Sequence, residues 1–290
     1  MNARPIFFTE SGAFRALWRL LFFSIASFTS LFVALAVLVA LSNLFPSIGA
    51  GGVTSQSLIS AAGVLGGTAF SLRFVDRRPW RDVWLGRDSA RPSLLAYGFA
   101  VGAVAVSVPI LSLIGAHWLR LETSAAGSLV ASGLRVTLFL LPAALFEELL
   151  TRGYILSVLR ETWGWPWAIA ATSVGFGMMH LANNGATVQS VALVTLAGFF
   201  LAGVLYATRS LYAAWMAHFA WNWMMAVFFH TAVSGYPLDA PRYRYVDAGP
   251  DWATGGAWGP EGGLPAGLGM CAGIGYLFVL RGRGSRRRET

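Results

Sequence analysis

The chain has 290 residues, of which 56% are apolar and only 12% are charged, and its mean hydropathy is +0.60. A soluble domain carries about 25% charged residues, so this composition excludes an ordinary soluble protein and predicts a membrane protein. The net charge of +8 comes from 21 arginines and no lysine. These arginines cluster at the ends of apolar runs, which favours membrane topology over nucleic-acid binding as the origin of the basic charge.

Eight apolar runs follow one another, each near the length of about 20 residues that a membrane-spanning helix needs. The first is too long for the core of a cleavable signal peptide, so we expect it to remain as a span. The second contains Gly63 and Gly67, whose spacing suits close helix packing or arises by chance in a glycine-rich chain. We predict an all-α fold, a polytopic membrane helix bundle forming a single domain over 1–290. The predicted spans are 16–43, 57–75, 93–116, 128–158, 166–183, 189–207, 210–230 and 264–280.

The connections between these runs predict the orientation. With both termini in the cytoplasm, seventeen arginines lie on the cytoplasmic side and three on the other, as the positive-inside rule requires. Residues 73–87 form an Arg-rich interfacial piece on that cytoplasmic face. Residues 231–263 form the longest polar connection and are predicted to be an external loop and a partial lid. We expect an integral protein of a bacterial plasma membrane.

The fourth run carries charge inside its apolar sequence, at Glu147, Glu148 and Arg152. Each such charge costs at least about 2.5–3.5 kcal/mol in the bilayer core unless it is paired. Glu148 and Arg152 are four residues apart, share a helix face and can form an ion pair. Glu147 points about 100° away and has no local partner, so we expect it to face the interior of the bundle.

Two further polar clusters interrupt later runs, FGMMH with His180 and HFAWN with His218 and Asn222. Taken alone, each histidine could be a satisfied packing residue, but polar residues within spans are functional by default. The turn ETWGWPW contains Gly164 and separates the fourth and fifth runs. An antiparallel hairpin about that turn places Glu147 level with His180. We therefore expect the three clusters to meet at one level and to open to the cytoplasmic side.

Two adjacent carboxylates, two histidines and one amide suit hydrolysis by an activated water. A carboxylate serves as general base, and His218 and Asn222 offer donors to the oxyanion of a tetrahedral intermediate. Glu147, His180 and His218 also match a zinc ligand set. The sequence leaves open whether zinc or only Glu147 and His180 hold the water.

The three clusters resemble the motifs EExxxR, FxxxH and HxxxN of the CAAX-protease and bacteriocin-processing (CPBP/Abi) family of intramembrane endopeptidases, which is related to type II CAAX prenyl endopeptidase. The resemblance covers about 134–230. It implies a peptidase that cleaves a membrane-associated peptide or protein, CAAX-like or bacteriocin-like, within the lipid bilayer. It further implies Glu147 as the base beside His180, support from Glu148 and Arg152, and an oxyanion or metal site at His218 and Asn222.

Two other classes of function are compatible with the same residues. A proton-coupled transporter would use the acids and histidines as a relay, and it would need a polar path through the first three spans, where few polar residues occur. A catalytically silent immunity or scaffold protein would keep the motifs for packing. Replacement of Glu147 by glutamine would leave the function of such a scaffold intact.

Overall fold

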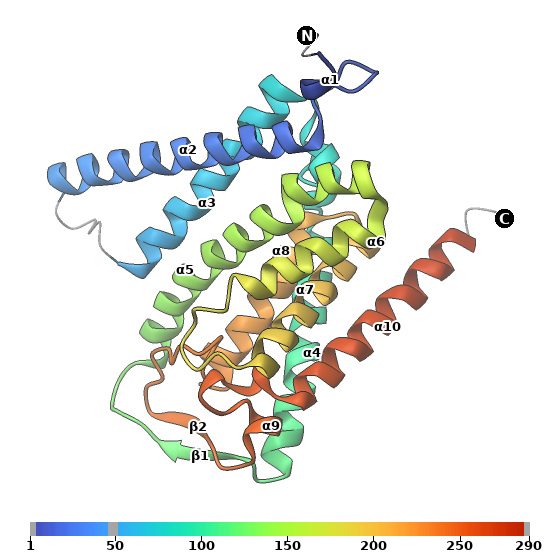
Figure 1. Ribbon diagram of the computed structural model, residues 1–290. Coiled ribbons are helices and arrows are strands. Elements are labelled where there is room, and N and C mark those ends of the chain that lie inside the picture. Colours follow the sequence, from blue (N-terminus) through green and yellow to red (C-terminus); the bar gives the residue numbers. More distant parts are fainter. Residues whose placement is uncertain (1–3, 46–51, 287–290) are drawn as a thin grey trace.

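The structure, a computed structural model, describes residues 4–45 and 52–286. It is an all-α helix bundle with one two-stranded sheet, which confirms the predicted fold class (Figure 1). The helices are α1 Arg4–Phe7, α2 Ala16–Leu44, α3 Val53–Phe70, α4 Pro92–Gly115, α5 Leu129–Glu148, α6 Tyr154–Met178, α7 Val188–Thr208, α8 Leu211–Trp223, α9 Asp251–Thr254 and α10 Leu264–Arg286. The strands are β1 Leu119–Thr123 and β2 Tyr243–Asp247. Single π-helical turns continue α3, α5 and α8 at Ser71–Val75, Leu149–Gly153 and Met224–Phe228.

Six helical stretches of the described chain are long and apolar enough to cross a membrane. One of them, Leu129–Met178, is 50 residues long and contains two predicted spans. It is divided at Gly164, whose φ of 79° and ψ of 172° interrupt α6 in the predicted turn. The run predicted at 210–230 is not among the six stretches, because α8 is short and carries polar and indole side chains. All eight predicted runs thus contain helices. By length and composition alone, the run at 210–230 does not qualify as a membrane span.

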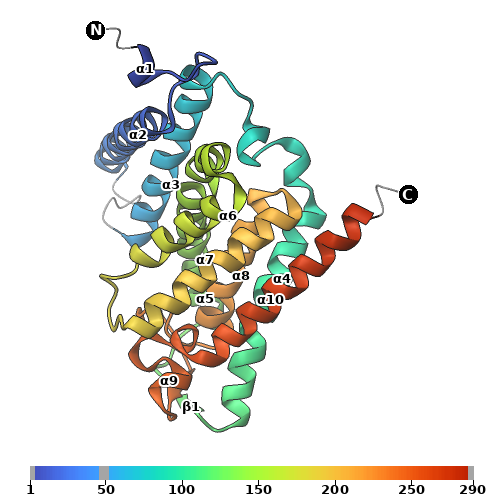
Figure 2. The ribbon, with the colours of Figure 1, turned by 45° about the vertical axis from the view of Figure 1, so that its right-hand side comes forward.

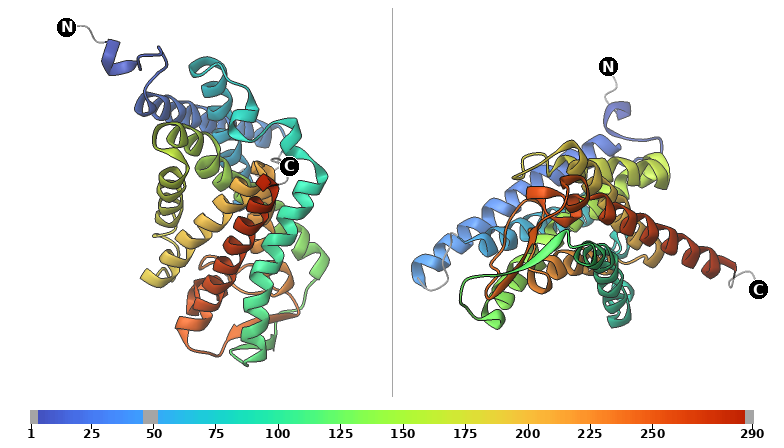
Figure 3. Two further views of the ribbon diagram at one scale, coloured as in Figure 1. Left: turned by 90° about the vertical axis from the view of Figure 1, so that its right-hand side faces the viewer. Right: turned by 90° about the horizontal axis from the view of Figure 1, so that it is seen from below.

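Helix α8 lies at the centre of the bundle, where it contacts α4, α5 and α7. Helix α10 runs beside α4 and α7 (Figure 2). Seen from below, α2 and α10 extend to opposite sides of the molecule (Figure 3). The central position of α8 is visible in its alanines, since Ala213, Ala214, Ala217 and Ala220 are fully buried.

Glycines set the close approach of α4 to α8. A Cβ atom on Gly98 would lie 2.1 Å from the carbonyl oxygen of Ala213, and one on Gly102 would lie 2.0 Å from that of Ala217. No side chain fits at either position, so the two backbones pack directly against each other. The predicted pair Gly63 and Gly67 packs in the same way, against Leu31 and Ser27 of α2.

The sheet and the 231–263 segment lie together at the end of the bundle away from the N-terminus (Figure 1). Strands β1 and β2 are antiparallel, with Leu119 opposite Asp247 and Thr123 opposite Tyr243. The predicted external loop is thus folded, since it contributes a strand, a short helix and two 3₁₀ turns. The assignment of this end to the outside of the cell remains a prediction from the arginine distribution.

A charged cluster at the opposite end joins α2 to the tip of α6. Arg19 donates to Asp76 at 2.7 Å and to Glu161 at 2.8 Å, and the Tyr154 hydroxyl donates to Asp76 at 2.9 Å. The side chains of Arg19 and Asp76 are only 8% and 7% exposed. Water therefore cannot replace the guanidinium if it is removed.

We expect Arg19→Ala to destabilise the fold by about 3–5 kcal/mol, because it leaves a buried carboxylate without its cation. The matched control is Arg78→Ala. Arg78 also pairs with Glu161 but is 38% exposed, so its loss should cost less than about 1 kcal/mol. Thermal unfolding in detergent measures both, and equal shifts for the two variants would contradict the structural role of Arg19.

Candidate active site

The charges of the first cluster lie at the junction of α5 and its π-helical turn. The side chains of Glu148 and Arg152 are both 0% exposed, and Nη1 of Arg152 lies 2.9 Å from Oε1 of Glu148. Arg152 also donates to the carbonyl of Gly198 in α7 at 3.0 Å, and its guanidinium lies 4.3 Å from the centre of the Phe176 ring in α6. The predicted ion pair is thus formed, and it joins three helices around the site.

The two histidines of the later clusters face Glu147. The Nε2 atoms of His180 and His218 each lie 3.8 Å from Oε2 of Glu147. This distance exceeds a direct hydrogen bond, and a water fits between such groups. Oε2 of Glu147 has no hydrogen-bond partner in the described protein. The inward orientation of Glu147 and its position level with His180 agree with the sequence predictions.

The other ring nitrogen fixes the orientation of each histidine. Nδ1 of His180 lies 2.8 Å from the carbonyl of Phe176, so this nitrogen must donate. Nδ1 of His218 lies 3.0 Å from Oε1 of Glu148, an arrangement in which the carboxylate accepts. In the neutral imidazoles the unprotonated Nε2 atoms therefore point at Glu147. Phe176 of the FxxxH motif thus contributes both its carbonyl to His180 and its ring to Arg152.

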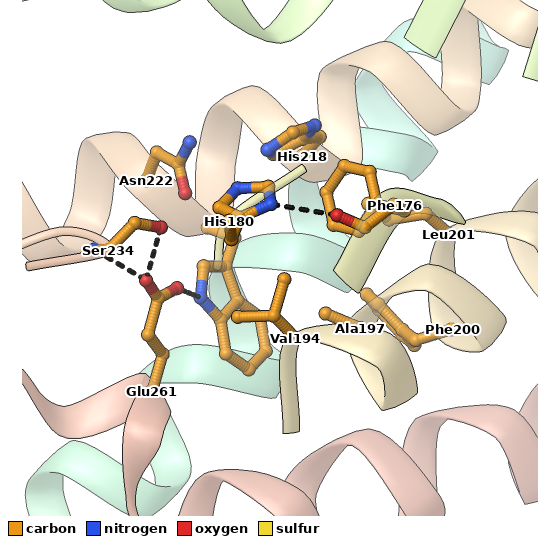
Figure 4. A pocket seen from close by; sticks show the side chains of 11 residues that line it. Phe176, His180, Val194, Ala197, Phe200, Leu201, His218, Asn222, Ser234 and Glu261 are labelled. Carbon is orange, nitrogen blue, oxygen red and sulfur yellow. Dashed lines mark hydrogen bonds between the residues drawn. The ribbon is translucent and has the colours of Figure 1, made fainter. Parts of the chain in front are cut away.

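Asn222 lies one turn beyond His218 on α8 and lines a small cavity together with both histidines (Figure 4). The cavity has a volume of about 30 Å³, which is about the volume of one water molecule. Its other walls are apolar side chains of α7 and two polar residues of the 231–263 segment, namely Val194, Ala197, Phe200, Leu201, Ser234 and Glu261.

The expected opening of the site to the cytoplasmic side stays a prediction. The cavity is bordered by Ser234 and Glu261, which belong to the segment at the opposite end of the bundle. The sequence analysis did not predict this border, because helical spacing does not show how an irregular segment folds back over the helices.

Residues 129–224, about a third of the chain, match the family described as type II CAAX prenyl endopeptidase Rce1-like. The resemblance inferred from the three motifs is confirmed, and it implies an intramembrane peptidase in general. Neither the search of curated proteins nor the search of solved structures gave a match.

All six site residues predicted from the sequence lie inside the matched segment 129–224, and the structure brings them to one place. Ser234 and Glu261 lie outside it and were missed. Glu261 is 6% exposed and accepts hydrogen bonds from the indole of Trp221 and from Ser234. Only the three-dimensional fold reveals Glu261, because nothing in the local sequence GPEGG distinguishes it from a surface turn.

The donor chemistry of the candidate site fits zinc. Two histidines present free Nε2 atoms to a carboxylate, and their Nδ1 atoms are held by a carbonyl and a carboxylate, as is usual for ligands of a metal. The spacing fits less well, since ligands about 2.1 Å from a tetrahedral ion lie about 3.4 Å apart. The corresponding atoms here are 3.8 Å apart. No group of three acidic, histidine or cysteine side chains in the described residues meets the geometry of a metal site.

Proposed function

We propose that this protein is an intramembrane endopeptidase that hydrolyses a peptide bond of a membrane-associated substrate by means of a water activated by Glu147 and His180. The substrate class is CAAX-like or bacteriocin-like. One observation carries the proposal: two imidazole Nε2 atoms lie at the same distance from one carboxylate oxygen that has no hydrogen-bond partner. A water bound there would donate to Oε2 of Glu147 and to Nε2 of His180, and it would keep a free lone pair for the carbonyl carbon.

The arrangement supports a distinct role for each side chain. Glu147 takes a proton from the attacking water and later returns it to the leaving amine. His180 orients the water through Nε2, because its Nδ1 proton is committed to the Phe176 carbonyl. A protonated His218 donates from Nδ1 to Glu148 and from Nε2 to the oxyanion, and the amide of Asn222 supplies a second donor. Arg152 balances the charge of Glu148 and keeps it in place.

The test of this function is a comparison of cells that carry the wild-type protein with cells that carry Glu147→Gln. We expect new termini in membrane-associated peptides of the wild-type cells that are missing from the variant. Their sequences would also name the substrate. Identical sets of termini in the two cell types would contradict a peptidase and favour the silent scaffold.

A metal test separates the two ways of holding the water. Glu147, His180 and His218 would hold a zinc ion, which would supply Lewis-acid activation of the attacking water. The wide spacing leads us to expect that turnover of the purified protein persists after dialysis against a chelator, without stoichiometric zinc in elemental analysis. One zinc per chain, lost together with activity and restored with it, would assign these three residues as ligands instead.

A further inference from the structure

We propose that residues 248–263, between β2 and α10, form a lid that must open before a peptide reaches the site, and that Glu261 is the latch of this lid. The inference deepens the proposed peptidase function and rests on it for one of its two tests. The lid contains α9 and the 3₁₀ turns Gly256–Trp258 and Pro260–Gly262. Six of its sixteen residues are glycine.

The size of the cavity makes opening necessary. About 30 Å³ holds roughly one water, so a peptide bond with its flanking side chains cannot enter the structure as it stands. Three walls belong to α6, α7 and α8. Arg152 joins α7 to the junction of α5 and α6, so separating these walls would break its hydrogen bond to Gly198 and disturb its buried ion pair with Glu148. The remaining wall consists of Ser234 and Glu261, outside the helices.

Glu261 makes the contacts that close this wall. Its Oε2 accepts from the indole Nε1 of Trp221 in α8 at 2.9 Å, which joins the lid to the helix that carries His218. Its Oε1 accepts from the backbone N–H of Ser234 at 2.6 Å and from the Ser234 hydroxyl at 2.7 Å. Figure 4 shows the carboxylate of Glu261 directed at Ser234, below Asn222 and His180. One side chain thus connects the lid, the preceding loop and α8.

The closed lid also contains uncompensated polar groups, which limits its stability. Glu261 is 6% exposed, yet it has no ion pair within the described chain and is held by neutral donors alone. Trp258 is fully buried and its Nε1 has no hydrogen-bond partner. Both groups would regain water on opening. Opening therefore breaks the hydrogen bonds of Glu261 and also exposes the ring of Trp258, which is 0% exposed in the closed state.

Backbone conformation on both sides of the latch favours release as well. Ser234 has a φ of +48°, a left-handed conformation that is unfavourable for a residue with a Cβ atom. In the lid, Gly255, Gly256 and Gly259 have φ values of +79°, +54° and +100°. These glycines allow the turns of the closed state. Besides Glu261, the lid is held by Gln189 of α7, whose Nε2 donates to the carbonyls of Trp252 and Gly262, and by the N–H of Gly235, which donates to the carbonyl of Trp258.

The first test measures opening without any catalysis. A reporter cysteine replaces Val194 in the cavity wall, a side chain that is only 5% exposed, in a protein whose exposed Cys271 is changed to alanine. Glu261→Gln keeps the shape of the latch but leaves one acceptor oxygen in place of two, so its NH2 group opposes either the Trp221 N–H or the Ser234 N–H. We expect it to raise the rate of cysteine modification by a small thiol reagent about tenfold, as a larger open fraction requires. The matched control is Asp251→Asn, which removes a carboxylate from the exposed surface of the same lid. An unchanged rate in Glu261→Gln overturns the latch.

The second test locks the lid. An ideal Cβ on Gly185, in the loop after His180, lies 3.1 Å from Cβ of Ala257 in the lid. A disulfide needs about 3.5–4.5 Å between these atoms, so a small shift allows Gly185→Cys and Ala257→Cys to form one. Gly185 has a φ of +69°, which strains a cysteine there, and the Gly185→Cys single variant measures the effect of this strain on activity. We expect peptide cleavage to stop in the oxidised protein and to return on reduction, while each single-cysteine variant stays insensitive to oxidation. Full activity of the oxidised pair overturns the lid.

The two tests separate failure of the lid from failure of the peptidase assignment. If the parent protein cleaves no peptide under any condition, the proposed function fails, and the cysteine-modification rates still decide whether Glu261 holds the lid. If cleavage occurs and is insensitive to the lock, the peptidase stands and the lid is a fixed wall.

Discussion

Replacing Glu147 with glutamine is expected to abolish peptide hydrolysis while the protein still folds. Glutamine has the same shape but cannot take a proton from water, and loss of a general base lowers the rate by about 10²–10⁴-fold. The structural cost should be small, because the side chain is 23% exposed and its Oε2 makes no hydrogen bond that would be lost. Turnover of a membrane peptide by the purified protein in detergent gives the rate, and thermal unfolding reports the fold.

The matched control for this experiment is Glu122→Gln, which removes an exposed carboxylate in β1, outside the matched segment 129–224. It should leave turnover unchanged. Turnover of Glu147→Gln within about threefold of the wild type would remove Glu147 from the role of base, since even weak general bases contribute more than that.

The second large effect concerns stability. We expect Arg152→Met to destabilise the protein by about 3–5 kcal/mol, because it leaves the carboxylate of Glu148 buried without a cation. Both side chains are 0% exposed, so water cannot take the place of the guanidinium. The midpoint of thermal unfolding in detergent measures the loss. Arg135→Met is the control, because Arg135 pairs with Asp239 at the surface and is 66% exposed.

A double variant separates the ion pair from simple packing. Glu148→Gln together with Arg152→Met removes both charges, so it should recover a large part of the stability lost in Arg152→Met alone. Activity should not recover, because the carboxylate that holds Nδ1 of His218 is also gone. If the double variant is as unstable as the sum of the single ones, the two charges do not act as a pair.

The sequence was sufficient for those parts of the site that follow from helix geometry. The four-residue spacing predicts the ion pair of Glu148 with Arg152, and the turn at Gly164 predicts that Glu147 and His180 lie level. Both predictions hold because helical spacing and antiparallel pairing are local rules.

Long-range contacts of irregular segments escaped prediction. The hydrogen bond from Trp221 to Glu261 joins residues 40 positions apart through turns with positive φ values, which no periodicity encodes. The π-helical turn at Leu149–Gly153 was also missed, although such turns are frequent at functional sites. The sequence therefore predicted which three clusters meet at the site, but it did not predict that Ser234 and Glu261 border the cavity.

The most direct test of the central claim is a single turnover of excess purified protein with its peptide substrate in water enriched in ¹⁸O. If a water held by Glu147 and His180 attacks the carbonyl, the new carboxyl group of the product carries one ¹⁸O atom and the protein peptide containing Glu147 carries none. Label in Glu147 would reveal a covalent acyl intermediate on that carboxylate. Either that result or the absence of any new peptide terminus would contradict direct attack by an activated water.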